Sequence, residues 1–139
     1  MPKKKTDLQI GQFKSKITVK NIGLTEKQKS LVRLGLDDNN KVIFITGPAG
    51  STKTFMAVYC ALKKLKQNDE LDLMYVRTVI ESADKGLGAL PGDIDEKFNP
   101  YMAPLDDKLR ELLPSGTGIR QELIQSKRAQ AMPVNFLRG

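Results

Sequence analysis

The most apolar stretches of the chain are two short runs that flank a longer helical pattern. The run KVIFIT at residues 41–46 is continuous and β-branched, which is typical of a strand buried on both faces of a parallel sheet. A second run at residues 71–76 predicts another strand, and the spacing between them predicts a helix that ends near Lys66. Strand, helix and strand form a βαβ unit, so we expect an α/β fold with a mostly parallel sheet.

Weaker patterns predict the other elements. Thr25 is placed as a helix N-cap with Gln28 three residues later, which is a capping box for a helix that continues through Leu34. The remaining expectations are a short strand at 17–19, a turn at 37–40, an ordered loop at 77–93, helical spacing within 95–113, a short helix at 119–126 and a strand that begins in 131–139.

Composition narrows the class of protein. The 139 residues match one domain, 40% of them are apolar and 28% are charged, as in a soluble globular protein. No apolar run approaches the length of a membrane span, so we expect a cytoplasmic protein without membrane contact. Histidine is absent, which excludes Ser-His-Asp and Cys-His catalysis within these residues. The single cysteine, Cys60, lies on the apolar helix and is interpreted as a core residue.

Charge divides the chain into two parts. Of the net charge of +7, most comes from residues 1–30, which hold eight lysines and only Asp7 and Glu26 as acids. We therefore treat residues 1–20 as a basic, partly disordered arm and residues 21–139 as the folded domain. Such an arm fits a polyanionic partner such as RNA or single-stranded DNA, and it equally fits a solvated tail without a partner.

The segment between the first strand and the helix carries the strongest chemical signal. Phosphate binding needs several backbone N–H groups aimed at one point, a helix N-terminus, a lysine for the β- and γ-phosphates and a hydroxyl for Mg²⁺. The loop GPAGSTKT provides these groups, with Lys53 as the lysine and Thr54 as the hydroxyl. The predicted phosphate-binding residues are Gly47, Pro48, Ala49, Gly50, Ser51, Thr52, Lys53 and Thr54. A plain strand-to-helix turn with an exposed lysine is the alternative.

One position departs from the pattern G-x-x-x-x-G-K-[ST]. Thr52 stands where the second glycine belongs. Because this residue directly precedes Lys53, we expect it to lie near helical geometry, where a side chain fits. The substitution would then affect affinity more than the identity of the loop.

A hydrolysing enzyme of this type also needs a buried strand that ends in a carboxylate for Mg²⁺. The predicted strand at 71–76 is followed by Arg77, and the segment 134–137 is followed by Arg138. Asp93 and Asp95 follow a turn instead. The chain therefore holds the phosphate-binding part of this machinery and lacks the carboxylates. Arg77 lies at the end of a strand, where it could contact a ligand or remain a plain surface residue.

These motifs together resemble the PhoH family of P-loop ATPases over residues 22–139. The most specific part is the run KGLGALPGD at 85–93, and EKFNPYMAPLDD at 96–107 continues it. The glycine-rich loop resembles the family's Walker A motif, and LTEKQ at 24–28 resembles an adenine-contacting glutamine element. FLRG at 136–139 resembles the segment just before the family's Walker B strand.

The resemblance implies the N-terminal part of a three-layer, RecA- or helicase-like P-loop NTPase that is incomplete at its C-terminus. It implies ATP and Mg²⁺ as cofactors, Lys53 and Thr54 as catalytic residues and Gln28 as an adenine contact, although Gln28 alone reads as a capping residue. It further implies an ATPase tied to RNA or other nucleic acid, homo-oligomers and, for a viral member, the host cytoplasm. The alternative is a regulatory or interaction module that binds nucleotide without hydrolysis, and a nucleotide kinase fits less well.

The arm gives a first testable prediction. If residues 1–30 bind RNA through lysine–phosphate contacts, the affinity for a single-stranded oligonucleotide should fall steeply with salt, because each contact releases counterions. Fluorescence anisotropy at several salt concentrations measures this slope. Deletion of residues 3–20 should weaken binding and flatten the slope, and an unchanged slope would remove the arm from the interface.

Overall fold

The computed structural model describes residues 16–78 and 99–137, and the expectations for residues 1–15 and 79–98 lie outside this part. The elements in chain order are α2 (Glu26–Leu36), α3 (Lys53–Gln67), β1 (Leu73–Arg77), α5 (Asn99–Leu112), α6 (Ile119–Gln125), β2 (Ala129–Pro133) and the 3-10 turn η2 (Val134–Phe136). The predicted helices and the strand at 71–76 are confirmed, and the last strand begins two residues earlier than predicted. An α/β fold with a small parallel sheet results.

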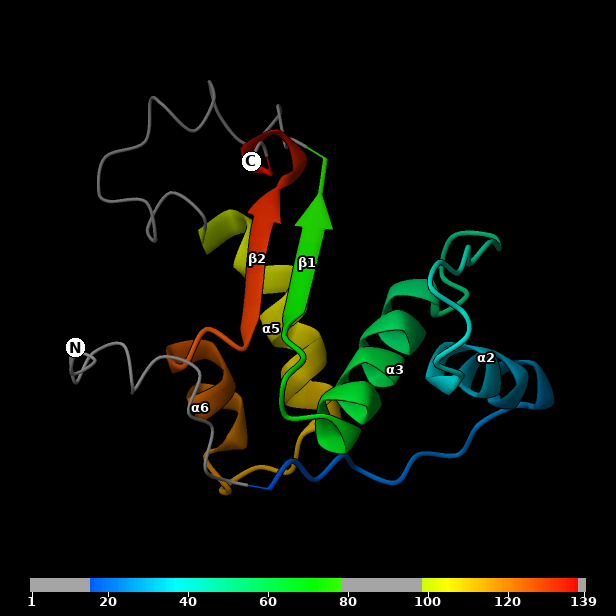
Figure 1. Cartoon of the computed structure of the whole chain (residues 1–139), viewed down its shortest axis with the longest axis horizontal. Helices are drawn as coiled ribbons and strands as arrows, with labels where there is room; N and C mark the ends of the chain where they lie inside the picture. Colours follow the sequence, from blue (N-terminus) through cyan, green and yellow to red (C-terminus); the bar gives the residue numbers. More distant parts are fainter. Residues whose placement is uncertain (1–15, 79–98, 138–139) are drawn as a thin grey trace.

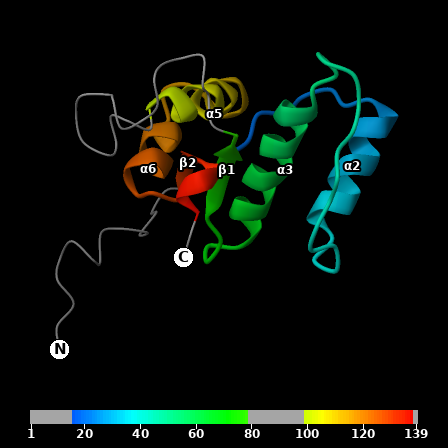
Figure 2. The same cartoon turned by 90° about the horizontal axis from the view of Figure 1, so that it is seen from above.

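The sheet of the described residues has two strands. β1 and β2 pair in parallel, with Leu73 opposite Ala129 and Arg77 opposite Pro133. Side chains alternate along both strands, so that Ala129, Ala131 and Pro133 are buried while Met74 and Val76 are exposed. α5 runs behind the strands in Figure 1 and covers the buried face, as the view from above also shows (Figure 2).

The core lies where α3, α5 and α6 meet this covered face. Among its most buried side chains are Leu62 of α3, Leu105 and Leu109 of α5 and Leu123 of α6, all 0% exposed. The chain before α2 contributes too, although the strand predicted at 17–19 does not form. Ile17 and Val19 point into the core, and the Lys20 N–H donates to the Leu112 carbonyl at 2.7 Å. A deletion that tests the basic arm without removing core residues must therefore stop before Ile17.

A buried cation fixes the connection between α3 and β1. Arg128 is 2% exposed and its guanidinium donates to the Leu71 carbonyl at 2.6 Å and to the Asn68 carbonyl at 3.5 Å. Its Nε lies 3.6 Å from a carboxylate oxygen of Asp72. Because the next residue begins β2, these contacts place the start of β2 beside the start of β1. Local sequence carried no signal for this role.

The strand predicted at 41–46 is wrong for the described structure. The run is extended but belongs to no sheet, and Val42 and Phe44 are 74% and 89% exposed. It lies beside α2, on the side of α3 away from β1, in both views (Figures 1 and 2). A β-strand needs a hydrogen-bonded neighbour, and within residues 16–78 and 99–137 no strand lies next to this run. Two of its apolar side chains still pack inward, because Ile43 and Ile45 face α2 and α3.

α2 packs closely against α3 because one residue of α2 has no side chain. Gly35 is buried, and a Cβ atom at this position would lie 3.1 Å from the Cys60 sulfur. The turn at 37–40 then reverses the chain, with the Asn39 N–H bonded to the Asp37 carboxylate at 2.9 Å.

Within residues 16–78 and 99–137, none of the helices has the length and apolar character of a membrane-spanning helix.

The buried face of α3 gives a stability prediction. Leu62→Ala should lower the free energy of unfolding by about 2–5 kcal/mol, because it removes a fully buried side chain and leaves a cavity. Leu34→Ala is the control, since Leu34 is 54% exposed and its loss should cost about 0.5 kcal/mol or less. Chemical denaturation measures both, and equal losses would contradict the assigned core.

Candidate functional site

The loop at residues 47–52 connects the extended run to α3 and depends on two glycines. A Cβ atom on Gly47 would lie 2.8 Å from the Ser51 hydroxyl oxygen, so a larger residue would displace this hydroxyl from the Pro48 carbonyl. Gly50 has φ +82°, a left-handed conformation that glycine adopts without steric cost. The Ser51 N–H and hydroxyl both donate to the Pro48 carbonyl, at 3.2 and 2.6 Å. The loop is therefore tightly curled, as phosphate binding requires.

The predicted lysine and hydroxyl are the first two residues of α3. The Lys53 ammonium donates to the Gly47 carbonyl at 2.6 Å and to the Pro48 carbonyl at 2.8 Å, so the cation lies across the loop. Thr54 follows with its side chain exposed. The first turn of the 15-residue helix contains no acidic residue, so its partial positive charge is not neutralised there. Loop, cation and helix terminus together fit an anionic phosphate group.

Thr52 does not have the near-helical geometry that its position suggested, and that expectation is wrong. It has φ 65° and ψ 24°, in the left-handed region. This conformation costs an L-residue about 1–2 kcal/mol, which explains why the standard pattern has glycine at this position. The backbone is left-handed at Thr52 because the chain must change direction from the curled loop to the axis of α3 within one residue. The Thr52 hydroxyl donates to the Ser51 carbonyl at 2.5 Å.

Gln28 is brought to the loop from α2. The capping box is confirmed, since the Gln28 N–H donates to the Thr25 hydroxyl at 3.2 Å and the Gln28 carboxamide oxygen accepts from the Thr25 N–H at 2.9 Å. The carboxamide nitrogen of Gln28 also donates to the Thr52 hydroxyl at 3.1 Å. This second contact joins residues 24 positions apart, and no local pattern could have indicated it.

Two cavities border the loop. The first, of about 520 Å³, runs from Gln28 along Leu31 and Leu34 to the loop and is bounded on its other side by Ile43 and Phe44. Its walls combine apolar side chains with the Gln28 carboxamide, two lysines, Lys27 and Lys53, and several hydroxyl groups. This combination suits a planar base next to phosphate groups.

The second cavity, of about 530 Å³, places two α5 residues opposite the loop. It is lined by Gly50 to Phe55 together with Lys108 and Glu111. These two side chains form an ion pair at 3.9 Å. The sequence prediction missed both residues because their proximity to the loop comes only from the packing of α5 against α3.

The family model described as PhoH-like protein matches residues 20–139. The chain belongs to the PhoH-like family. A PhoH-like protein of Bacillus subtilis is 34% identical over 123 residues, which cover 88% of this chain and 36% of that protein. Protein PhoH of Escherichia coli K12 is 33% identical over 118 residues, which cover 84% of this chain and 32% of that protein.

The similarity covers a limited part of these relatives. A PhoH-like protein of Synechocystis is 35% identical over 98 residues, which are 70% of this chain and 29% of that protein. The chain thus spans about a third of the length of the curated relatives that it matches. No solved structure matches.

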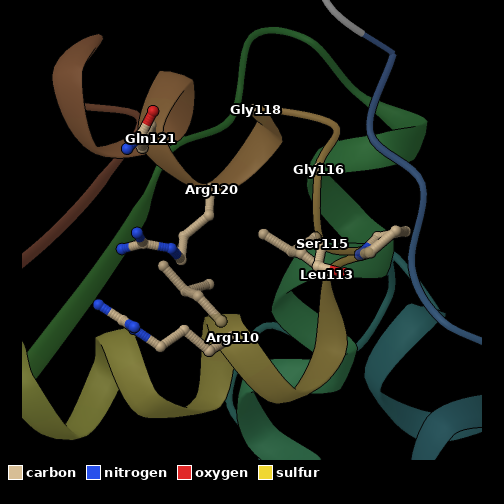
Figure 3. Close-up of a pocket in the computed structure, with 9 residues that line it drawn as sticks. Arg110, Leu113, Ser115, Gly116, Gly118, Arg120 and Gln121 are labelled. Carbon is tan, nitrogen blue, oxygen red and sulfur yellow. The ribbon is translucent and has the colours of Figure 1, made fainter.

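A third cavity of this PhoH-like chain lies away from the loop, between α5 and α6. It has a volume of about 640 Å³, and Figure 3 shows Arg110 and Arg120 on one side of it with Leu113 and Ser115 on the other. Both arginines are ion-paired with Asp106, Arg110 at 3.1 Å and Arg120 at 2.5 Å. None of the predicted phosphate-binding residues lines this cavity.

The other candidates are separate from the loop. Arg77 is the exposed last residue of β1 and lines neither cavity that borders the loop. Cys60 is buried as predicted, and burial raises the pKa of its thiol. Among the described residues of this PhoH-like chain, no three His, Cys, Asp or Glu side chains are grouped so that they could hold a metal ion.

The burial of the Cys60 thiol gives a prediction about its chemical reactivity. Because the raised pKa lowers the thiolate fraction at any given pH, Cys60 should react with iodoacetamide at pH 8 far more slowly than a free cysteine peptide. Unfolding in guanidinium chloride should restore the peptide's rate. Mass spectrometry over time measures both rates, and equal rates in folded and unfolded protein would contradict the assigned burial.

Proposed function

We propose that the folded residues of this PhoH-like chain bind ATP with Mg²⁺. The observation that carries the proposal is the curled loop that leads into the start of α3, with the Lys53 ammonium 2.6 and 2.8 Å from its first two carbonyls. In this role the backbone of residues 47–53 cradles phosphate and Lys53 neutralises the β- and γ-phosphates. Thr54 would provide a ligand to Mg²⁺, which shields phosphate charge when it is bound.

The base belongs, on this proposal, in the cavity between α2 and the run 41–46. That cavity is continuous with the loop, so one nucleotide reaches from Lys53 to Gln28. A carboxamide pairs well with adenine because it donates to one ring position and accepts from the neighbouring amino group. Gln28 is therefore assigned to the adenine, which agrees with the family resemblance.

Hydrolysis is the further step of the proposal, because the chain resembles a family of ATPases. Such an ATPase needs a carboxylate that holds Mg²⁺. Within the described residues β1 ends at Arg77 and β2 at Pro133, so neither strand provides this carboxylate. Binding without turnover is the second candidate function, and these strand ends are the observation that favours it. Phosphate release above background in this chain would exclude the second candidate.

The three-layer, RecA- or helicase-like arrangement is also proposed. Its support is the parallel pairing of β1 with β2 and the packing of α3 and α5 against this sheet. Residues 21–139 would then supply the N-terminal part of the domain.

RNA or single-stranded DNA is the proposed partner. The lysine-rich residues 1–20 and the exposed Arg77 at the end of β1 support this partner by charge. A cytoplasmic location and a homo-oligomer complete the proposal, in line with the family resemblance.

Lys53→Ala tests the phosphate site. We expect it to abolish binding of a fluorescent ATP analogue, because the β/γ charge then lacks its cation. Lys66→Ala is the matched control, since it removes one positive charge from the exposed last turn of the same helix and should leave binding unchanged. Titration by fluorescence anisotropy measures both. Retained affinity in Lys53→Ala would show that the loop is not a phosphate site.

A further inference from the structure

The contact between Thr52 and Gln28 combines two unusual features. Thr52 is a β-branched residue in the left-handed region, where glycine would fit without strain. Its hydroxyl also accepts a hydrogen bond from the carboxamide of Gln28 at 3.1 Å. A glycine at position 52 would relieve the strain and lose this bond. The side chain at position 52 therefore adds a contact that the standard phosphate-loop pattern lacks.

Hydrogen-bond geometry shows what the contact does to the carboxamide. The oxygen end of Gln28 accepts from the Thr25 N–H at 2.9 Å. The nitrogen end donates to the Thr52 hydroxyl, whose own hydrogen goes to the Ser51 carbonyl at 2.5 Å. The hydroxyl therefore faces Gln28 as an acceptor only. Both ends of the carboxamide are held. Rotation by 180° would place its NH₂ group against the Thr25 N–H, and the Thr52 hydroxyl would have to give up the Ser51 carbonyl to donate to the oxygen.

The fixed carboxamide keeps bonding capacity for a ligand. A primary carboxamide has two N–H donors and two acceptor lone pairs, and the contacts with Thr25 and Thr52 use one of each. One donor and one acceptor remain. Gln28 and Thr52 line the same cavity as Lys53, where the proposed nucleotide extends from its phosphates to its base.

We infer that the Thr52 hydroxyl is a positioning residue for base selection, which holds the Gln28 carboxamide in the orientation that reads adenine. This inference rests on the proposed ATP binding. Adenine presents an amino donor beside a ring-nitrogen acceptor, and an oriented carboxamide matches this pair. Hypoxanthine has a carbonyl acceptor in place of the amino group, so the same orientation disfavours inosine triphosphate.

Three ligands separate base selection from phosphate binding: ATP, inosine triphosphate and inorganic tripolyphosphate. Thr52→Val keeps the branched shape and removes the hydroxyl, whereas Thr52→Ser keeps the hydroxyl. We expect Thr52→Val to lower the ratio of ATP to inosine triphosphate affinity about fivefold, the equivalent of one neutral hydrogen bond. Thr52→Ser should keep the wild-type ratio. Because ATP and inosine triphosphate carry the same triphosphate, the ratio cancels any change that either variant causes in phosphate binding, and tripolyphosphate affinity measures that change separately. Isothermal titration calorimetry measures the three affinities.

Further variants exclude indirect effects. Gln28→Ala should lower the ratio at least as much as Thr52→Val, and the double variant should lower it no further than Gln28→Ala alone, because the Thr52 hydroxyl acts only through the carboxamide. Thr25→Ala weakens the cap of α2 but leaves the Thr25 N–H on Gln28, so it should keep the ratio. Thr52→Ala replaces Thr52→Val if circular dichroism shows that the valine variant is unfolded.

The outcomes distinguish the two proposals. Tripolyphosphate and ATP binding that Lys53→Ala abolishes, combined with a wild-type ratio in Thr52→Val, would overturn the positioning role and leave ATP binding intact. Additive losses in the double variant would overturn it as well. Absence of binding by all three ligands would overturn both proposals.

Discussion

Burial of one face of α3 is the constraint on which the site depends. Six of its residues are buried: Met56, Val58, Tyr59, Cys60, Leu62 and Leu65. A fully buried aliphatic or aromatic side chain contributes about 1.5–3 kcal/mol to the free energy of folding. This packing fixes the helix against α5 and the sheet. Because Lys53 and Thr54 begin the same helix, the packing also fixes where the cation, the hydroxyl and the positive helix end lie.

The loop and α2 form one connected unit through a single carboxamide. The Gln28 carboxamide accepts a hydrogen bond from the N–H of Thr25, the N-cap of α2. It also donates to the hydroxyl of Thr52, the strained residue of the loop. α2 reaches this position because Gly35 allows it to approach α3 closely at its other end. The surrounding packing and hydrogen bonds therefore hold Thr52 in its strained backbone conformation.

The extended run before the loop illustrates the limit of a hydrophobic pattern. Its alternate residues Ile43 and Ile45 face the two helices, while the side chains of Val42 and Phe44 are largely exposed. An extended chain has unsatisfied backbone groups as well as side chains, and it becomes a strand only beside another strand. The described part of the chain provides that neighbour for β1 and β2 and not for this run.

Local chemistry in the sequence determined the helices, the capping box at Thr25 and the residues of the glycine-rich loop. Each depends on neighbours within about one helical turn, so its signal is contiguous. The tertiary structure decided what depends on distant partners: the pairing of β1 with β2, the burial of Arg128 and the approach of Lys108 to the loop. It also decided the left-handed backbone of Thr52 and its bond to Gln28, because a curled loop must join a helix whose axis is set by packing elsewhere in the core.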